Sequence, residues 1–199
     1  SVIALAKWSI SRKVKKFLFA STGNIYGSKN RINYESTIPE PDTFYGISKY
    51  SSELLLKPFS TYFDILILRI FGLYGPGQKD ALLPSIINKV LNEEKISLAK
   101  NIGVKYNPIF VSDCAKIINH LINKKDLSSF EVINIGGDEI IDIKKICDTL
   151  SNIIGKDYYS VYLDSDPHYL IGGIDKLLNL IPSLNLVSFE DGLKNVLSK

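Results

Sequence analysis

Three short apolar runs constrain the fold of this chain more than any other feature. They lie at residues 17–21, 65–70 and 131–135, and their β-branched and aromatic side chains favour buried strands. Apolar residues at helical spacing lie between these runs, as at 82–91. Strands that alternate with helices imply a parallel sheet with right-handed crossovers. The sequence therefore predicts an α/β fold.

Local signals predict where several elements begin and end. Four helix starts are expected at capping side chains, which are Thr43, Ser112 or Asp113, Asp142 and Ser188. Gly155 is expected to end the helix that Asp142 begins. Further short strands are expected over 96–99 and 104–111. The chain between the second and third apolar runs is long, and we expect it to form a smaller lobe at the carboxyl edge of the sheet.

The overall charge argues against two classes of partner. The chain has 24 basic and 21 acidic residues, and its net charge of +3 indicates neither a nucleic acid nor an anionic membrane surface. No apolar stretch reaches the roughly 18 residues of a transmembrane helix, so the cytoplasm is the expected compartment. Cys114 and Cys147 are expected to be reduced core thiols. His120 and His168 have no further ligands in view, and no metal site is predicted.

Two segments carry the candidate chemistry. The run F-L-F-A-S-T-G-N-I-Y-G at 17–27 predicts a strand that ends in hydroxyl side chains. The run Y-G-I-S-K places Tyr45 and Lys49 on one face of a helix. An alcohol, a phenol and an ammonium group near one point suit proton and hydride transfer at a sugar carbon. The alternative interpretation is a surface Tyr–Lys pair and a hydroxyl that only binds local backbone.

Five motifs in order resemble a known family. They are S-T-G-N-I-Y-G at 21–27, Y-G-I-S-K at 45–49, L-R-I-F-G-L-Y-G-P-G-Q at 68–78, N-P-I-F-V-S-D-C-A at 107–115 and V-I-N-I-G-G at 132–137. The set resembles the extended short-chain dehydrogenase/reductases. More narrowly, it is similar to the NAD-dependent epimerase/dehydratase group that acts on nucleotide sugars. The resemblance covers almost the whole chain.

The resemblance implies a domain organisation. It predicts the C-terminal part of a Rossmann-type parallel sheet with a small α/β substrate-binding lobe. Residues 1–74 and 112–155 would belong to the dinucleotide-binding domain, and 75–111 and 156–199 to the lobe. The G-x-x-G-x-x-G turn with which the family begins is not in this sequence. We therefore expect a fragment of a longer protein; the alternatives are that another chain supplies that half, or that the chain is a degenerate remnant.

The resemblance also implies roles for individual residues at a cofactor site. Tyr45 would be the acid/base, and Lys49 would lower its pKa from the ordinary value near 10 while it holds the nicotinamide ribose. Thr22 would bind the substrate oxygen that Tyr45 protonates, with Ser21 as the alternative hydroxyl. NAD or NADP would be bound by a set of five residues, which are Ala20, Ser21, Tyr45, Lys49 and Phe71.

The expected substrate is a nucleotide sugar. Its predicted contacts are Thr22, Asn24, Gly72, Gln78, Lys105 and Tyr106. Some of these positions depart from the family pattern: Gly23 and Asn24 replace the Asp-Glu pair of the 4,6-dehydratases, which argues against dehydration. Gly72 stands where the family often has Asn. The pair Tyr106–Asn107 stands where the family often has Arg-Asp, so Lys105 would have to supply a positive charge. Arg69 is expected to be structural.

The leading hypothesis is therefore an epimerase that works through a transient keto sugar. One alternative is an NADPH-dependent 4-keto-sugar reductase. A second alternative is a non-catalytic scaffold or cofactor sensor, which Gly72 and Tyr106 motivate and the presence of Thr22, Tyr45 and Lys49 opposes. The family commonly dimerises through the helix that carries the tyrosine and the helix before it, so a homodimer is expected.

Overall fold

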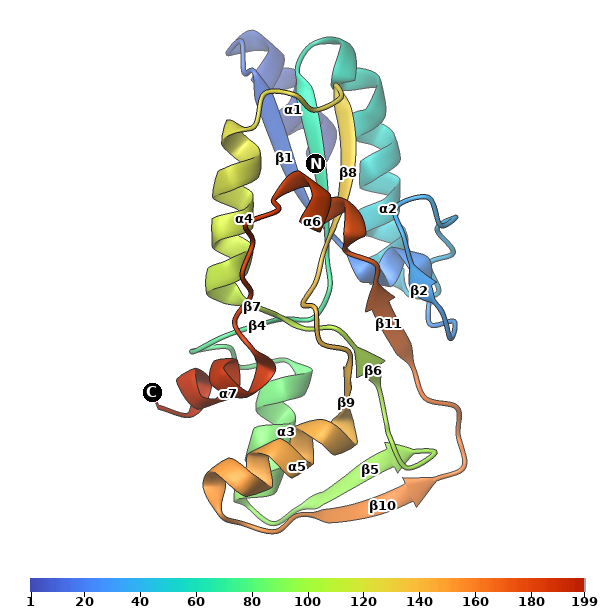
Figure 1. Ribbon diagram of the computed structural model, residues 1–199. Helices are drawn as coiled ribbons and strands as arrows, with labels where there is room; N and C mark the ends of the chain where they lie inside the picture. Colours follow the sequence, from blue (N-terminus) through green and yellow to red (C-terminus); the bar gives the residue numbers. More distant parts are fainter. Residues whose placement is uncertain (199) are drawn as a thin grey trace.

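A parallel three-stranded sheet organises the larger part of the molecule (Figure 1), which confirms the predicted α/β class. The computed structural model describes residues 1–198; Lys199, the end of the predicted lobe, lies outside the described residues. The strands have the order β1-β3-β8 and are β1 (Lys16–Thr22), β3 (Asp64–Ile70) and β8 (Phe130–Ile135). Each contains one of the three apolar runs.

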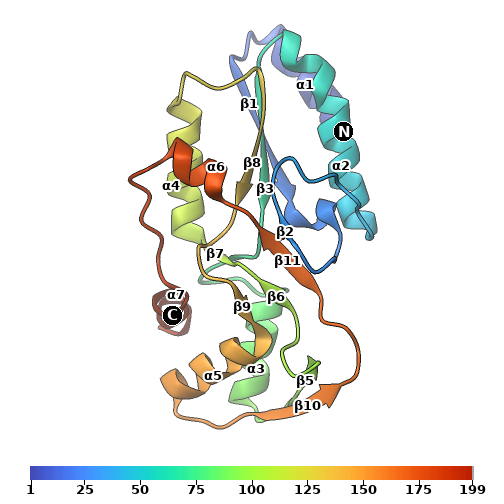
Figure 2. The ribbon, with the colours of Figure 1, turned by 45° about the vertical axis from the view of Figure 1, so that its right-hand side comes forward.

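Helices cover both faces of this sheet (Figure 2). One face carries α1 (Val2–Ser11) and α2 (Phe44–Leu56), and the other carries α4 (Val111–Asn123) and α6 (Asp175–Leu180). The central strand β3 explains the arrangement, because its successive apolar side chains point to opposite faces. Ile65 and Ile67 pack with α1 and α2, whereas Leu66 and Leu68 pack with α4 and α6.

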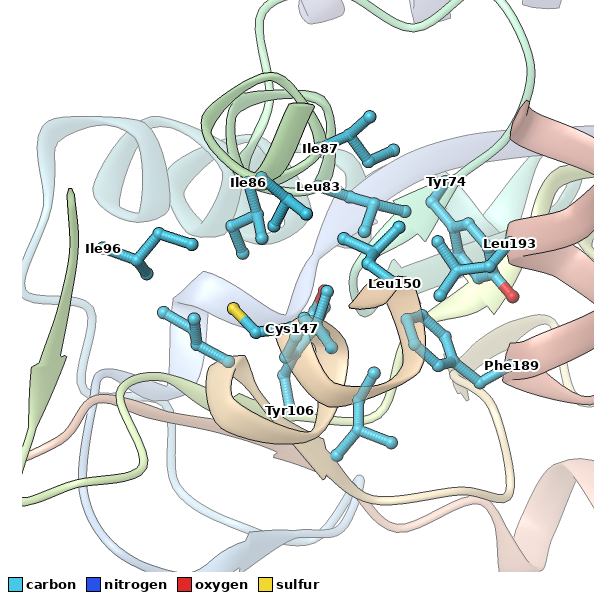
Figure 3. Close-up of a cluster of buried hydrophobic side chains, with 14 of the residues drawn as sticks. Tyr74, Leu83, Ile86, Ile87, Ile96, Tyr106, Cys147, Leu150, Phe189 and Leu193 are labelled. Atoms are coloured by element: carbon cyan, nitrogen blue, oxygen red, sulfur yellow. The ribbon is translucent and has the colours of Figure 1, made fainter. Parts of the chain in front are cut away.

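A second lobe lies beyond the carboxyl ends of these strands, in the lower half of Figure 1. It contains α3 (Leu82–Leu91), α5 (Ile143–Ile154), α7 (Phe189–Leu197) and the parallel pair β5 (Lys95–Ala99) and β10 (Tyr159–Leu163). Figure 3 shows its core, to which the three helices contribute side chains such as Ile86, Leu150 and Phe189. The predicted division of the chain stays a prediction, and this packing favours placing α5 in the second lobe.

Short strands join the two parts. One sheet has the order β2-β11-β6-β9, and a separate pair joins β4 to β7. The bounds are β2 (Ile32–Asn33), β4 (Leu73–Tyr74), β6 (Lys105–Tyr106), β7 (Ile109–Phe110), β9 (Ile141–Asp142) and β11 (Tyr169–Gly172). The expected single strand over 104–111 is wrong, because Asn107 and Pro108 separate β6 from β7. The Asn107 side chain instead bonds the backbone of Gly137 and Gly172, and Pro108 has no N–H to donate.

Three of the four predicted helix caps are confirmed. Thr43, Asp142 and Ser188 each accept a hydrogen bond from a backbone amide in the first turn of their helix. Gly155 ends α5 in the left-handed conformation, at φ 74°. The expected cap at Ser112 or Asp113 is wrong, because α4 begins at Val111 directly after β7. The Asp113 carboxylate instead accepts from the amide of Val187 at 2.7 Å and so ties the C-terminal segment to α4.

The chain also forms two short 3-10 helices, which are η1 (Gly23–Tyr26) after β1 and η2 (Lys57–Thr61) after α2. Cys114 and Cys147 are free and buried, as predicted. Strand β11 and helix α6 are not foreseen from the sequence, because both are short and the pair Gly172–Gly173 lies where one gives way to the other. Within residues 1–198, no helix has the length and apolar character needed to cross a membrane.

Candidate active site

Helix α2 presents the candidate acid/base residues. Thr43 begins the helix by accepting a 3.0 Å hydrogen bond from the amide of Gly46. Tyr45 and Lys49 are four residues apart and therefore lie on one face of the helix. Tyr45 is 53 % exposed, and its hydroxyl makes no hydrogen bond within residues 1–198. The phenol is therefore open to a ligand.

Lys49 ties this helix to the end of β1. Its Nζ atom donates to the carbonyl oxygen of Ala20 at 2.8 Å. The same nitrogen lies 5.0 Å from the centre of the Phe19 ring and 5.8 Å from that of Tyr45, within range of a cation–π contact. The ammonium group thus stands between the last residues of the strand and the candidate phenol.

Thr22 is the last residue of β1 and the cap of η1. Its side chain is buried, and Oγ1 accepts a hydrogen bond from the amide of Asn24 at 3.2 Å. A hydroxyl that accepts from the backbone keeps its own O–H free to donate. The Thr22 hydroxyl therefore has one donor left for a further hydrogen bond.

Two contacts bracket Thr22 and bring α2 against it. Lys49 reaches Ala20, two residues before Thr22, as described above. Gly46 reaches Asn24, two residues after it: a Cβ atom at Gly46 would lie 2.7 Å from the Asn24 carbonyl oxygen. Only glycine permits this approach between backbones. The residue beside Tyr45 is thus held against the turn that Thr22 begins.

Ser21 is oriented differently from Thr22. Its hydroxyl donates to the Glu53 carboxylate inside the protein, and the side chain is buried. This commitment favours Thr22 over Ser21 as the substrate-facing hydroxyl. Ala20 is exposed, and its carbonyl is the acceptor for Lys49.

Phe71, a predicted cofactor contact, has a fully buried ring. The ring is enclosed by Gly23 and Gly172, whose Cβ atoms would lie 2.4 and 2.5 Å from it. Any cofactor contact by this residue would therefore use its backbone. The same packing leaves no room for an acidic side chain at position 23, which agrees with the argument against dehydration.

The predicted substrate contacts do not all come together. Asn24 lines a cavity of about 270 Å³ between the start of α2 and strand β11, together with Thr43, His168 and Leu170. Gln78 lines a separate hollow on the loop after β4, and its side chain donates to the Leu73 carbonyl at 3.1 Å. Neither Lys105 nor Tyr106 lines either cavity.

Tyr106 lies in the core of the second lobe and is 5 % exposed. Burial raises the pKa of its phenol above the ordinary value. Gly72 has φ +55°, and a Cβ atom there would lie 2.6 Å from the Tyr106 ring. Gly72 and Tyr106 therefore fit each other, and little of the Tyr106 side chain remains for a ligand. Lys105, partly exposed beside it, keeps its predicted role only as an expectation.

Sequence reasoning missed a set of buried polar residues under the site. Arg69, expected to be structural, bonds the Glu53 carboxylate and the Tyr26 hydroxyl, with 2.7 Å from Nη2 to Glu53 Oε2. The available signal was chemical: an arginine inside an Ile/Leu strand and a glutamate on the lysine face of a helix each need a buried partner.

The fold is that of a Rossmann-type protein, with a tyrosine and a lysine on one helix at the carboxyl end of a parallel strand. The sequence model of the NAD dependent epimerase/dehydratase family matches residues 1–136. The chain therefore belongs to this family, whose members use NAD.

Individual relatives agree with this assignment. An uncharacterized UDP-glucose epimerase of Bacillus subtilis, YtcB, is 29% identical over 92% of this chain and 59% of its own length. The dTDP-4-dehydro-6-deoxyglucose reductase of Escherichia coli is 28% identical over 71% of this chain and 46% of that protein. The UDP-glucuronic acid 4-epimerase of Bacillus cereus, solved in complex with NAD, superposes with a TM-score of 0.88 at 28% identity and covers 98% of this chain and 62% of its own. The chain thus spans about half to three-fifths of these curated relatives.

Proposed function

We propose that this chain carries the acid/base site of an enzyme that epimerises a nucleoside-diphosphate sugar through a transient keto intermediate. The observation that carries the proposal is the pair of contacts that bracket Thr22. Lys49 bonds Ala20 and Gly46 packs on Asn24, so the helix that carries Tyr45 and Lys49 contacts the chain on both sides of Thr22.

Each residue has a separate task in this proposal. Tyr45 takes the proton of the sugar hydroxyl when the alcohol becomes a ketone, and it returns the proton when the alcohol is restored. Lys49 places its positive charge beside this phenol, with Nζ 5.8 Å from the centre of the Tyr45 ring. Thr22 donates its O–H to the same sugar oxygen and fixes the position of that oxygen.

The residues present fit the ribose of a nicotinamide cofactor. After its bond to Ala20, Lys49 retains two N–H groups, and Tyr45 retains its full hydroxyl capacity within residues 1–198. Both can hold ribose hydroxyls. When bound, NAD supplies the ring that stores a hydride while the sugar is a ketone.

The decisive experiment follows the epimerisation of UDP-glucose and UDP-glucuronic acid by proton NMR, with the full-length protein. Tyr45→Phe is expected to lower kcat by about 10²–10⁴-fold, the usual contribution of a general acid/base. Tyr50→Phe is the matched control, because Tyr50 lies on the same helix and is expected to change kcat less than twofold. Wild-type turnover in Tyr45→Phe would contradict the proposal.

A reductase is the second candidate, because the Escherichia coli relative is a 4-keto-sugar reductase by name. It predicts that one NADPH is consumed for each keto sugar reduced, whereas an epimerase shows no net change in cofactor. A non-catalytic module predicts cofactor binding without turnover of any nucleotide sugar.

We also propose a homodimer through α1 and α2. These helices expose large apolar side chains, among them Leu5, Trp8 and Leu54, each more than half exposed. Such surface is typical of protein interfaces. Sedimentation equilibrium of the full-length protein tests the proposal, and a monomer at micromolar concentration would contradict it.

A further inference from the structure

A continuous network of buried polar side chains lies beneath the acid/base residues. Its members come from five different elements and are at most 5 % exposed; in bonding order they are Ser21, Glu53, Arg69, Tyr26 and Asn134. Hydrogen bonds join each member to the next. Such a network is costly to bury unless every group is satisfied.

Glu53 is the point where the network meets helix α2. Its carboxylate accepts the hydroxyl of Ser21, and Arg69 approaches the same carboxylate through Nη2 at 2.7 Å and through Nε at 3.2 Å. Burial alone would lower the pKa of the Arg69 guanidinium, but hydrogen bonding to Glu53 and the charge of that carboxylate raise it. The charged guanidinium therefore meets the Glu53 carboxylate inside the protein, where the two residues are 5 % and 3 % exposed.

From Arg69 the network continues to the short strands β2 and β11, which join the two parts of the molecule. Arg69 Nη1 donates to the Tyr26 hydroxyl at 2.7 Å, and Tyr26 donates to Asn134 at 3.0 Å. Burial raises the pKa of Tyr26, which keeps the phenol protonated for this bond. Asn134 then donates to the carbonyls of Asn33, the last residue of β2, and of Gly173, which directly follows β11.

The position of Glu53 on its helix sets this network apart from ordinary core packing. Tyr45, Lys49 and Glu53 follow at intervals of four residues and share one face. Lys49 bonds Ala20 and Glu53 bonds Ser21, so this face contacts two consecutive residues of β1 just before Thr22. A rotation or slip of α2 would break both contacts together.

A buried ion pair is weak evidence for stability, because well-packed apolar side chains serve a core equally well. A buried ion pair can instead fix the relative position of two elements, because bidentate hydrogen bonds between charged groups are specific in geometry. We propose that Glu53, held by Arg69 and Ser21, is a positioning residue that sets the register of α2 on β1 and so places Tyr45 and Lys49 at Thr22. The proposal rests on the proposed function.

The first test compares two core variants of the full-length protein. Glu53→Gln keeps the shape of the side chain and removes its charge. We expect kcat to fall about tenfold or more, with KM for the sugar changed less than about threefold, because a small misplacement of a reacting group lowers kcat strongly. Leu56→Ala is the control: this leucine is fully buried on the same helix but lies outside the network. It should lower the unfolding midpoint and leave kcat within about twofold.

A double variant separates positioning from stability. Glu53→Leu with Arg69→Met replaces the pair by apolar side chains, which is expected to recover most of the stability lost in Glu53→Gln. The proposal predicts that kcat stays low in the recovered protein. Recovery of kcat together with stability would overturn it, and so would a Leu56→Ala variant that loses kcat as strongly as Glu53→Gln.

Hydrogen exchange supplies a readout that needs no substrate. In Glu53→Gln the amides of residues 45–49 are expected to exchange faster than in the wild type, whereas Leu56→Ala should leave them unchanged. Wild-type exchange in Glu53→Gln would overturn the positioning role. If the wild-type protein turns over no sugar while Glu53→Gln still exchanges faster than it, the proposed function alone would be contradicted.

Discussion

Gly46 tests whether the approach of α2 to the η1 turn is needed for catalysis. Gly46→Ala adds one methyl group at the point where the helix meets the chain after Thr22. The new Cβ atom would lie 2.7 Å from the Asn24 carbonyl oxygen, 3.1 Å from Pro41 Cβ and 3.2 Å from the Asn24 carbonyl carbon. Two of these three atoms belong to the backbone, so no side-chain rotation relieves the clash.

The size of the effect follows from two opposing terms. Forcing a methyl group into a packed contact typically costs about 1–3 kcal/mol. Alanine is also a better helix former than glycine by up to about 1 kcal/mol. The free energy of unfolding should therefore fall by about 1–2 kcal/mol. The helix must retreat by several tenths of an ångström, which separates Tyr45 from Thr22, and kcat should fall by about tenfold to a hundredfold.

The assay measures kcat and urea unfolding of the same variants of the full-length protein. Ser51→Ala is the matched control, since Ser51 is exposed on α2 and the change raises helix propensity without a clash. It should leave kcat unchanged and stability equal or slightly higher. Gly46→Ala with wild-type kcat would refute the reasoning, because the approach of α2 to the turn would then be irrelevant to the reaction.

Two further predictions concern stability. Thr43→Ala removes the cap of α2 and should lower the free energy of unfolding by about 1 kcal/mol; an unchanged urea midpoint would contradict the capping role. Burial alone would raise the pKa of Glu131, but its bonds to Lys176 and Ser128 hold that pKa below the ordinary 4.5. A carboxylate whose pKa is lower in the folded than in the unfolded protein stabilises the fold above pH 4.5. This contribution is lost as the pH falls through the pKa of the folded state. Glu131→Gln should therefore be less stable than the wild type at pH 7, and the difference should shrink as the pH falls below 4.5. A stability difference independent of pH would exclude the ion pair as its source.

Much of the fold followed from local pattern. The three apolar runs became the sheet, and Thr43, Asp142 and Ser188 cap their helices as predicted, because capping depends only on residues within one turn. The prediction is wrong at Asp113, which the same capping preference identified as a possible helix cap. That carboxylate instead serves Val187, which lies 74 residues further along the chain.

The candidate site divides in the same way. The spacing of Tyr45 and Lys49 already placed them on one helix face, since helical periodicity is a property of the chain itself. The contact of Lys49 with Ala20 depends on the packing of α2 against β1, and no local pattern encodes it. The partners of Glu53 lie 32 residues before it and 16 residues after it, in two different strands.

The amino-acid sequence thus determined which elements form and which chemical groups they carry, because periodicity and capping act over a few residues. Only the tertiary structure decided which of those groups meet. It encloses Tyr106 in the core, bonds Ser21 to Glu53 and packs α2 on the turn that follows Thr22. The physical reason is that a buried polar group must find its partner in space, and close packing of helices on a sheet decides where that partner lies.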